Sequence, residues 1–578
     1  VEKGQNAALN FTRKVTDYMA ENKFKEASDL FEGGINDCII KETSRVIIQR
    51  VSSYIESDNV EHNEEAIHYC TKILNAIVEK VDPSETILRF LEELDTISDI
   101  KFSIILRLVG RSISKMADKS EEIKWSISTL RFYIGDLAIS VKESEESTIE
   151  MNKTVSVYNA IILFLDPLVQ EVSLETENTQ NSAELRYYLL SLLIFLMGEP
   201  LCHLQDHVLE SQSDKPLPEK IISLISRITG DLFWCINIVS NRSKSKCIEK
   251  KHIDKETCNI KVILFELNEN VPDLAYANLY FYIVTKLHLW ETVPQVYNWQ
   301  YIFEACTYLI VKLLQEKEIV TTRKGLNLMS HLLNRLTRHF LTLESLEVFM
   351  YSELLDVLMR VMIYCDSNKE RRKALELFRE YLEMFDMQAR YHVVTHLYQT
   401  CEHSGLLSLT TGILKDSVIK CLQTTPPTPY FLGKNLESLL KLACKLPHGS
   451  ESDLVEISDE IITSLNLLRF LFLRDQHNQT GIWNCKNKLK NDFLTPLRKG
   501  INLCRTHWKV KIKDLEEQRK TMKINNIELE KSDADITLTV GGEILPPMPV
   551  LEKISFCHKA VNGLDVMENV LIRVNECI

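Results

Sequence analysis

The sequence NKERRKALELFREYLEMF, from Asn368 to Phe385, points most directly to the fold class of this chain. Its larger apolar residues recur three or four positions apart or as adjacent pairs, which is the period of one face of an α-helix. They are Ala374, Leu375, Phe378, Tyr381, Leu382 and Phe385. Ser367 and Glu370, at the start of the stretch, have the spacing of a capping box. The stretch therefore predicts an amphipathic helix with one buried face.

The same pattern continues on both sides of this helix. Residues 351–365 and 387–401 also have helical spacing, and short polar breaks at 366–367 and 402–405 separate the segments. The repeating unit is a helix, a turn and a second helix, about 40 residues in all. Because one hairpin cannot bury both of its faces, neighbouring hairpins have to stack. The sequence predicts an all-α fold, a HEAT-like α-solenoid of stacked helical hairpins, with two or three separate bundles as the alternative.

Smaller signals refine this prediction. Gly (17) and Pro (15) are each about 3% of the 578 residues, well below average usage, while 45% of the residues are hydrophobic. These values exclude β-sandwich, collagen-like and globally disordered chains. Asp166-Pro167 resembles the turn chemistry of HEAT repeats. The segment ITLTVGGEI, residues 536–544, predicts a small β-hairpin near the C-terminus with Gly541-Gly542 at its turn.

The loop segments of the chain suggest two regions. The proline-rich segment TTPPTPY at 424–430 is the clearest late boundary. We expect an N-terminal HEAT-like helical-repeat region, residues 1–424, and a C-terminal helical-repeat region, residues 425–578. The longest apolar run, residues 187–197, is too short for the roughly 20 residues that span a bilayer, so it predicts a buried core helix and no membrane contact.

The net charge and the cysteine pattern limit the classes of partner and the cellular compartment that we expect. The net charge of −13 makes nucleic acid a poor default partner. The 15 cysteines include no C-x-x-C pair, and the first residues have no apolar segment typical of a signal peptide. We therefore expect a reducing, cytoplasmic location. The basic segment 241–255 is either a solvated loop or a nuclear-localisation-like tract, which leaves the nucleus open.

The sequence gives no positive sign of catalysis. His203 and His207 in HLQDH have metal-ligand spacing, but the glutamate of the HExxH motif is absent. Cys401-Glu402-His403 places a thiol near a base, yet adjacent residues at a helix end point in different directions. No phosphate-binding glycine loop, nucleophile elbow or kinase signature is present. We expect no enzyme activity, no metal and no cofactor.

A basic segment near the C-terminus is more informative. Residues 478–531 hold 13 Lys and Arg against 6 Asp and Glu, a surplus of 7. Trp483, Phe493, Leu497 and Trp508 are interleaved with these charges. Such a segment is either a solvated helical face with core aromatic residues or a docking surface for a partner with acidic patches.

Three parts of this end resemble a known family. They are SLNLLRFLFLRD at 464–475, NQTGIW at 478–483 and FLTPLR at 493–498. They resemble the signature segment of the family of glomulin and the plant aberrant lateral root formation protein. The specific resemblance covers about residues 440–578, while the first 400 residues resemble the family only in length and helical-repeat character. The motif positions are Arg469, Asn478, Thr480, Gly481, Trp483, Phe493, Pro496, Leu497 and Arg498. The resemblance implies that Arg469, Asn478, Thr480, Trp483, Phe493, Leu497 and Arg498 bind the partner, although several of the motif residues are expected to shape the region.

The resemblance implies a non-catalytic HEAT-like protein. Its C-terminal region, residues 425–578 here, would grip the RING domain of the RING-box subunit of cullin–RING ubiquitin ligases. It would cover the surface that the ubiquitin-conjugating enzyme uses, and so inhibit ubiquitin transfer. The resemblance also implies a looser link of the N-terminal part to an FK506-binding immunophilin. A general HEAT-type scaffold that binds its partner along the N-terminal solenoid is the alternative.

Overall fold

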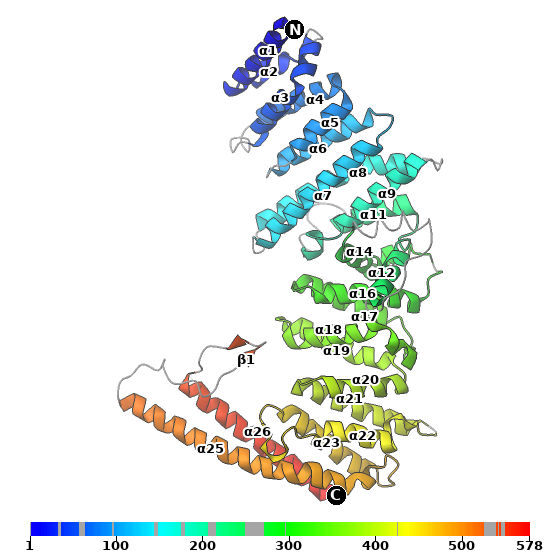
Figure 1. Cartoon of the computed structure of the whole chain (residues 1–578), viewed down its shortest axis with the longest axis vertical. Helices are drawn as coiled ribbons and strands as arrows, with labels where there is room; N and C mark the ends of the chain where they lie inside the picture. Colours follow the sequence, from blue (N-terminus) through cyan, green and yellow to red (C-terminus); the bar gives the residue numbers. More distant parts are fainter. Residues whose placement is uncertain are drawn as a thin grey trace. The chain divides into compact units, whose positions relative to one another are not determined.

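The computed structural model is predominantly helical (Figure 1). It describes residues 2–32, 36–56, 64–94, 98–143, 148–174, 180–205, 215–248, 271–294, 296–424, 426–524, 539–540, 543–544 and 549–578. The chain packs into two compact units. Unit 1 comprises residues 1–336 and 349–377, and unit 2 comprises residues 337–348 and 378–578. The boundary expected at 424 lies inside unit 2, so it stays a prediction about binding regions.

Unit 1 is a succession of helices. The helices are α1 (Glu2–Ala20), α2 (Phe24–Asp29), α3 (Asp37–Glu56), α4 (Glu64–Lys80), α5 (Pro83–Glu92), α6 (Asp99–Ser114), α7 (Ser120–Glu143), α8 (Thr148–Leu174), α9 (Gln180–Leu196), η3 (Leu201–His203), α11 (Leu217–Thr229), α12 (Ile236–Ile248), α14 (Asp273–Thr285), α15 (Leu287–Trp290), α16 (Trp299–Gln315), α17 (Ile319–Leu333) and α18 (Phe349–Tyr364). Helix α19 (Asn368–Met384) contributes to both units.

Successive hairpins of unit 1 stack on one another. Helix α1 packs on α3, α4 on α6, α6 on α8, α7 on α9, and α16 on both α14 and α18. Packing between near neighbours in the chain is the pattern of a helical-repeat array, in which each repeat supplies the surface that buries the next. The predicted all-α fold of stacked hairpins is confirmed for the described residues.

Helix α19 follows the predicted pattern closely. Five of the six predicted core residues are buried, and Leu375 is half-buried while Leu377 is buried. The Ser367 hydroxyl donates to the Glu370 carboxylate, so the two capping residues do meet. Pro167, by contrast, lies inside α8 and forms no turn. Its neighbours Leu168 and Val169 are buried, and their packing outweighs the cost of about 3 kcal/mol of an interior proline.

Two segments of unit 1 are long and apolar enough to cross a membrane, by length and composition alone. They are Glu150–Leu174 and Ala183–His203, with mean hydropathies of 1.3 and 1.4. The apolar window of the second segment is 67% buried within the fold, as in a core helix. It contains the run 187–197, whose Leu189, Leu192 and Leu193 are buried, so the predicted core helix is confirmed.

Unit 2 continues the helical array. Its elements are η4 (Leu343–Glu347), α20 (Met387–Thr400), α21 (Ser404–Gln423), η5 (Pro429–Phe431), α22 (Gly433–Ala443), η6 (Gly449–Glu451), α23 (Ser458–Arg474), η7 (Ile482–Cys485), α24 (Lys486–Leu489), the π-helical turn η8 (Lys490–Leu494), α25 (Thr495–Ile524) and α26 (Val550–Cys577). Helix α23 packs on α21 and α26, and the long helices α25 and α26 lie side by side (Figure 1). Leu414, Leu468, Leu497 and Leu571 share one core.

The expected β-hairpin is not established by the structure. Two strands of two residues each, β1 (Thr539–Val540) and β2 (Glu543–Ile544), pair antiparallel. The remaining residues of the predicted hairpin, 536–538 and the Gly541-Gly542 turn, lie outside the described residues. Four paired residues do not make the nine-residue hairpin, so the hairpin stays a prediction.

Candidate partner-binding surface

The turn that follows α23 is built around Asp475. The side chain of Asp475 is 4% exposed. Its Oδ1 accepts a hydrogen bond from Gln479 N at 2.6 Å, and its Oδ2 accepts from Thr480 N at 2.7 Å. The Thr480 hydroxyl also donates to Oδ2. Three donors thus replace the hydrogen bonds to water that a buried carboxylate loses.

Asn478 and Trp483 complete the same turn. Asn478 adopts a φ of 55°, a conformation that Asn tolerates better than most residues. Its side-chain Oδ1 accepts from Trp483 N at 3.1 Å. The indole Nε1 of Trp483 donates to the Asp475 carbonyl at 2.7 Å, and its ring meets Phe472 edge-on at 5.1 Å. Asn478 and Trp483 therefore hold the turn closed.

The turn also docks on the start of α22. Gly433 N donates to the Thr480 carbonyl at 2.9 Å. Gly481 has a φ of 80°, which favours glycine, and a Cβ there would lie 3.3 Å from Gly433 Cα. The glycine of the N-x-T-G segment is thus required by backbone conformation and by a close approach of two backbones.

Three of the predicted binding residues are buried. Thr480 holds the turn, and Phe493 and Leu497 lie in the core of unit 2. Buried side chains offer little area to a partner, so in this structure these three shape the surface, and a role in binding stays a prediction for them. Arg469 on α23 is half-buried and Arg498 on α25 is exposed. A contact role for these two arginines and for half-buried Asn478 and Trp483 stays a prediction.

Helix α25 presents an exposed basic face. We call it the α25 face, and its residues are Arg498, Lys499, Leu503, Lys509, Val510 and Lys513, all exposed. At 100° per residue they fall within about 140° of the helix circumference. Leu503 is 57% exposed and Val510 is 53% exposed. The sequence holds no Asp or Glu from Phe493 to Lys513. This face therefore combines exposed apolar side chains with surrounding positive charge.

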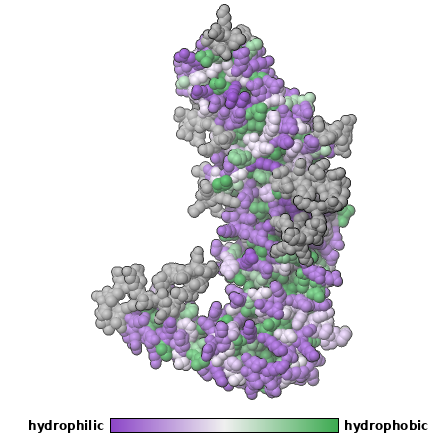
Figure 2. All heavy atoms as spheres, viewed as in Figure 1, coloured by the Kyte–Doolittle hydropathy of each residue, from purple (hydrophilic) through white to green (hydrophobic). Residues whose placement is uncertain are grey.

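The opposite side of α25 is fixed to α26. Arg505 forms ion pairs with Glu568 and, at 2.9 Å, with Asp565, and these contacts raise the pKa of its guanidinium. Trp508 packs beside Leu515 and meets Phe556 edge-on at 5.9 Å. In Figure 2, hydrophilic residues with smaller hydrophobic patches cover the visible side of unit 2. The helix pair is a stiff support for the α25 face.

The described histidine and cysteine residues that the sequence offered for catalysis make contacts within the fold. His403 caps α21, because its ring accepts from Leu406 N at 3.3 Å. Burial raises the pKa of the Cys401 thiol, which disfavours the nucleophilic thiolate. His203 faces Glu199 at 3.3 Å, and His207 lies outside the described residues. Among the described residues, no group of three or more His, Cys, Asp or Glu side chains could hold a metal ion.

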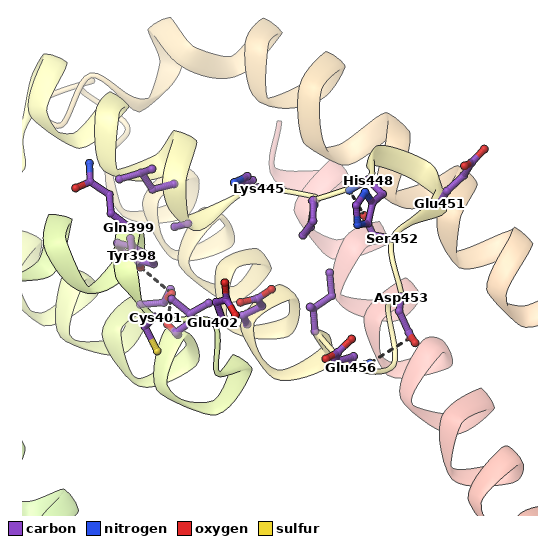
Figure 3. A pocket seen from close by; sticks show the side chains of 17 residues that line it. Tyr398, Gln399, Cys401, Glu402, Lys445, His448, Glu451, Ser452, Asp453 and Glu456 are labelled. Carbon is purple, nitrogen blue, oxygen red and sulfur yellow. Dashed lines mark hydrogen bonds between the residues drawn. The ribbon is translucent and has the colours of Figure 1, made fainter. Parts of the chain in front are cut away.

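A cavity of about 630 Å³ is the second candidate site in unit 2. It opens where the turn between α20 and α21 faces the segment between α22 and α23 (Figure 3). Apolar residues such as Leu407, Leu442 and Ile457 form part of its wall. The sequence did not indicate this cavity, because its lining is spread over more than 60 positions from Tyr398 to Glu460.

Asp475 is a further position that the sequence patterns did not single out. It stands three residues before Asn478 and five before Thr480, and Asp commonly bonds backbone N–H groups just after itself in turns. That spacing is the sequence feature that could have indicated the role of Asp475 in the turn. The structure shows that Asp475 accepts hydrogen bonds from Gln479, Thr480 and Trp483 around the turn.

Comparisons with known proteins place the chain in a family. The model of an uncharacterised protein family, YAP/Alf4/glomulin, matches residues 36–536. Glomulin of Homo sapiens is 28% identical over 556 residues, covering 95% of this chain and 90% of that protein. Glomulin of Mus musculus is 28% identical over 522 residues, covering 88% and 83%. A solved circular tandem repeat protein covers 99% of this chain and 98% of its own at 10% identity, but its TM-score of 0.21 supports no argument. Because the family match spans most of both units, this chain belongs to the YAP/Alf4/glomulin family.

Proposed function

We propose that this chain is a non-catalytic binding protein that masks the RING domain of the RING-box subunit of cullin–RING ubiquitin ligases. It would occupy the surface that the ubiquitin-conjugating enzyme needs, and so inhibit ubiquitin transfer. The observation that carries this proposal is the α25 face, an exposed basic surface with Leu503 and Val510 among its charges. Membership of a family that includes glomulin supports it.

Masking needs shape and charge and no bond-making step. A competitor has to present a few apolar anchors and complementary charge on a support that does not deform. The pairing of Arg505 with Asp565 and Glu568 keeps α25 against α26. The Asp475 turn fixes the segment that enters α25. The partner surface should therefore be acidic with an apolar centre.

The proposal extends to location and to a further partner. We propose a cytoplasmic location, since a partner in cullin–RING ligases would be met there, with the nucleus also open. Binding of an FK506-binding immunophilin by the N-terminal region is a separate part of the proposal. Neither nucleic acid nor a membrane is needed as a partner.

The Arg498→Glu variant should bind the RING-box–cullin complex about tenfold more weakly than the wild-type chain. The substitution reverses a charge at the first turn of α25, next to Lys499, and would repel an acidic partner surface. Isothermal titration calorimetry of the full-length chain with the purified complex measures the effect.

Arg379→Glu is the matched control. Arg379 is an exposed arginine on α19, in the part of that helix that belongs to unit 2. It makes the same charge change away from α25 and should leave the dissociation constant unchanged. Equal losses in both variants, or no loss with Arg498→Glu, would contradict the assignment of the α25 face. Binding that maps instead to residues 1–424 would favour the general HEAT-type adaptor.

A further inference from the structure

The cavity in unit 2 has an excess of unpaired negative charge. Its lining residues include five acidic ones, of which Glu460 is half-buried and Glu402, Glu451, Asp453 and Glu456 are exposed, and two basic ones, Lys445 and His448. Asp453 Oδ1 accepts from Val455 N at 3.0 Å and so has a structural partner. The other four carboxylates have no ion pair with any described residue.

The carboxylates approach the cavity from different elements. Glu402 lies in the turn between α20 and α21, and Glu456 lies in the segment that leads to α23 (Figure 3). Glu460 is in the first turn of α23 and is half-buried. Burial, and then the charge of Glu456, raise the pKa of Glu460 to about 7. Burial and neighbouring carboxylates disfavour the ionised form of a carboxylate, and a cation that enters the cavity stabilises that form.

The rest of the lining suits a side chain with an apolar stem. Leu407, Leu442 and Ile457 provide apolar surface, and the Tyr398 hydroxyl is hydrogen-bonded to Thr411 at 2.8 Å inside the wall. A volume of about 630 Å³ lies in the range of sites that bury a ligand, and it exceeds the volume of one side chain. The occupant should therefore be a short segment with a cationic side chain.

We propose that this cavity binds an arginine side chain from a peptide segment of a partner protein. A guanidinium offers five N–H donors in a planar fork that matches carboxylates on facing elements, and it sheds water more readily than an ammonium group. Its aliphatic stem would lie along the apolar wall. A metal ion does not fit, because among the described residues no three His, Cys, Asp or Glu side chains lie close enough together to hold one. None of the residues of the α25 face lines this cavity.

A labelled peptide tests the proposal directly. The probe is fluorescein-labelled Gly-Leu-Arg-Leu-Gly-amide, and fluorescence anisotropy with the full-length chain at pH 8 measures its binding. Replacing arginine with citrulline keeps the shape and removes the charge, so the citrulline peptide should bind at least about tenfold more weakly. A lysine peptide should bind with intermediate affinity. Equal binding of the arginine and citrulline peptides, or no saturable binding of either, would overturn the proposal.

Variants locate the binding in the cavity. Glu460→Gln and Glu456→Gln should each weaken the arginine peptide about fivefold or more, because each keeps the side-chain shape and removes one carboxylate charge. Glu552→Gln, at an exposed position in the first turn of α26, is the matched control and should bind as the wild type does. Arg498→Glu should also bind the peptide normally, so failure of this site and failure of the α25 face are distinguishable. Wild-type affinity in both cavity variants would exclude the cavity.

The pH dependence of binding gives a second readout. Glu460 is ionised above pH 7 and neutral below it, so the arginine peptide should bind several-fold more tightly at pH 8 than at pH 6. The other titratable and charged residues that line the same cavity are Tyr398, Cys401, Glu402, Lys445, His448, Glu451, Asp453 and Glu456. The dependence should be smaller in Glu460→Gln, and an unchanged profile would contradict the role of Glu460.

Discussion

Replacement of Asp475 with alanine should lower the free energy of unfolding by about 3 kcal/mol. The buried carboxylate accepts from Gln479 N, Thr480 N and the Thr480 hydroxyl. Alanine would leave these donors without a partner, and a buried unsatisfied donor costs about 1–3 kcal/mol. Thr480 is buried and cannot turn to water without opening the turn. The loss is a large share of the roughly 5–15 kcal/mol that stabilises a typical protein.

Urea unfolding followed by circular dichroism measures this loss as a shift in the midpoint. Asp492→Ala is the matched control, because Asp492 is exposed in η8 and should change stability by less than about 0.5 kcal/mol. Hydrogen exchange at Thr480 and Trp483 should accelerate in Asp475→Ala and stay slow in the control. Equal midpoints for the two variants would show that the carboxylate does not organise the turn.

The second large effect is expected at Lys324, a buried lysine of α17 in unit 1. Its Nζ donates to the Cys202 carbonyl at 2.8 Å and to Asn278 Oδ1 at 3.0 Å. The same amine lies 5.8 Å and 5.5 Å from the ring centroids of Phe281 and Tyr282. It thus connects α17 to η3 and α14. Lys324→Ala should cost about 3–5 kcal/mol, since it opens a cavity and removes the donor to two buried acceptors.

Two further variants separate the causes at this position. Lys324→Met keeps most of the apolar volume and removes the donor, so it should lose less stability than Lys324→Ala but more than a surface change. Lys317→Ala, at an exposed position just before α17, should be nearly neutral. Thermal unfolding by calorimetry measures all three. A methionine variant as stable as the wild type would mean that the hydrogen bonds of Lys324 contribute nothing.

Helix positions could be predicted because their signal is local. The segments expected at 351–365 and 387–401 correspond to α18 (Phe349–Tyr364) and α20 (Met387–Thr400). Apolar spacing within one helix sets both of them. The division into two units could not be predicted, because it depends on packing between residues far apart in the chain. It falls within α19, between Leu377 and Phe378, where the sequence shows no break in helical pattern.

The binding surface could be predicted only in part. Residue types and spacing located the basic segment, and the family resemblance located the turn. They did not show which side chains face outward, and Phe493 and Leu497 are core residues. The helical period separates the two sides of α25. Leu503 and Val510 fall on one side, and the opposite side holds Leu497, Ile501, Trp508 and Leu515. The cavity could not be predicted, because stacking of two hairpins creates it.

A ubiquitin-transfer assay tests the masking role most directly. The ligase would be assembled from a RING-box–cullin complex, a ubiquitin-conjugating enzyme and labelled ubiquitin, and the full-length chain would be added in increasing amounts. The account predicts that inhibition approaches completion when the chain saturates the ligase, that a large excess of conjugating enzyme restores transfer, and that Arg498→Glu inhibits far less. Undiminished transfer with the saturating wild-type chain, or inhibition that excess conjugating enzyme does not relieve, would contradict it.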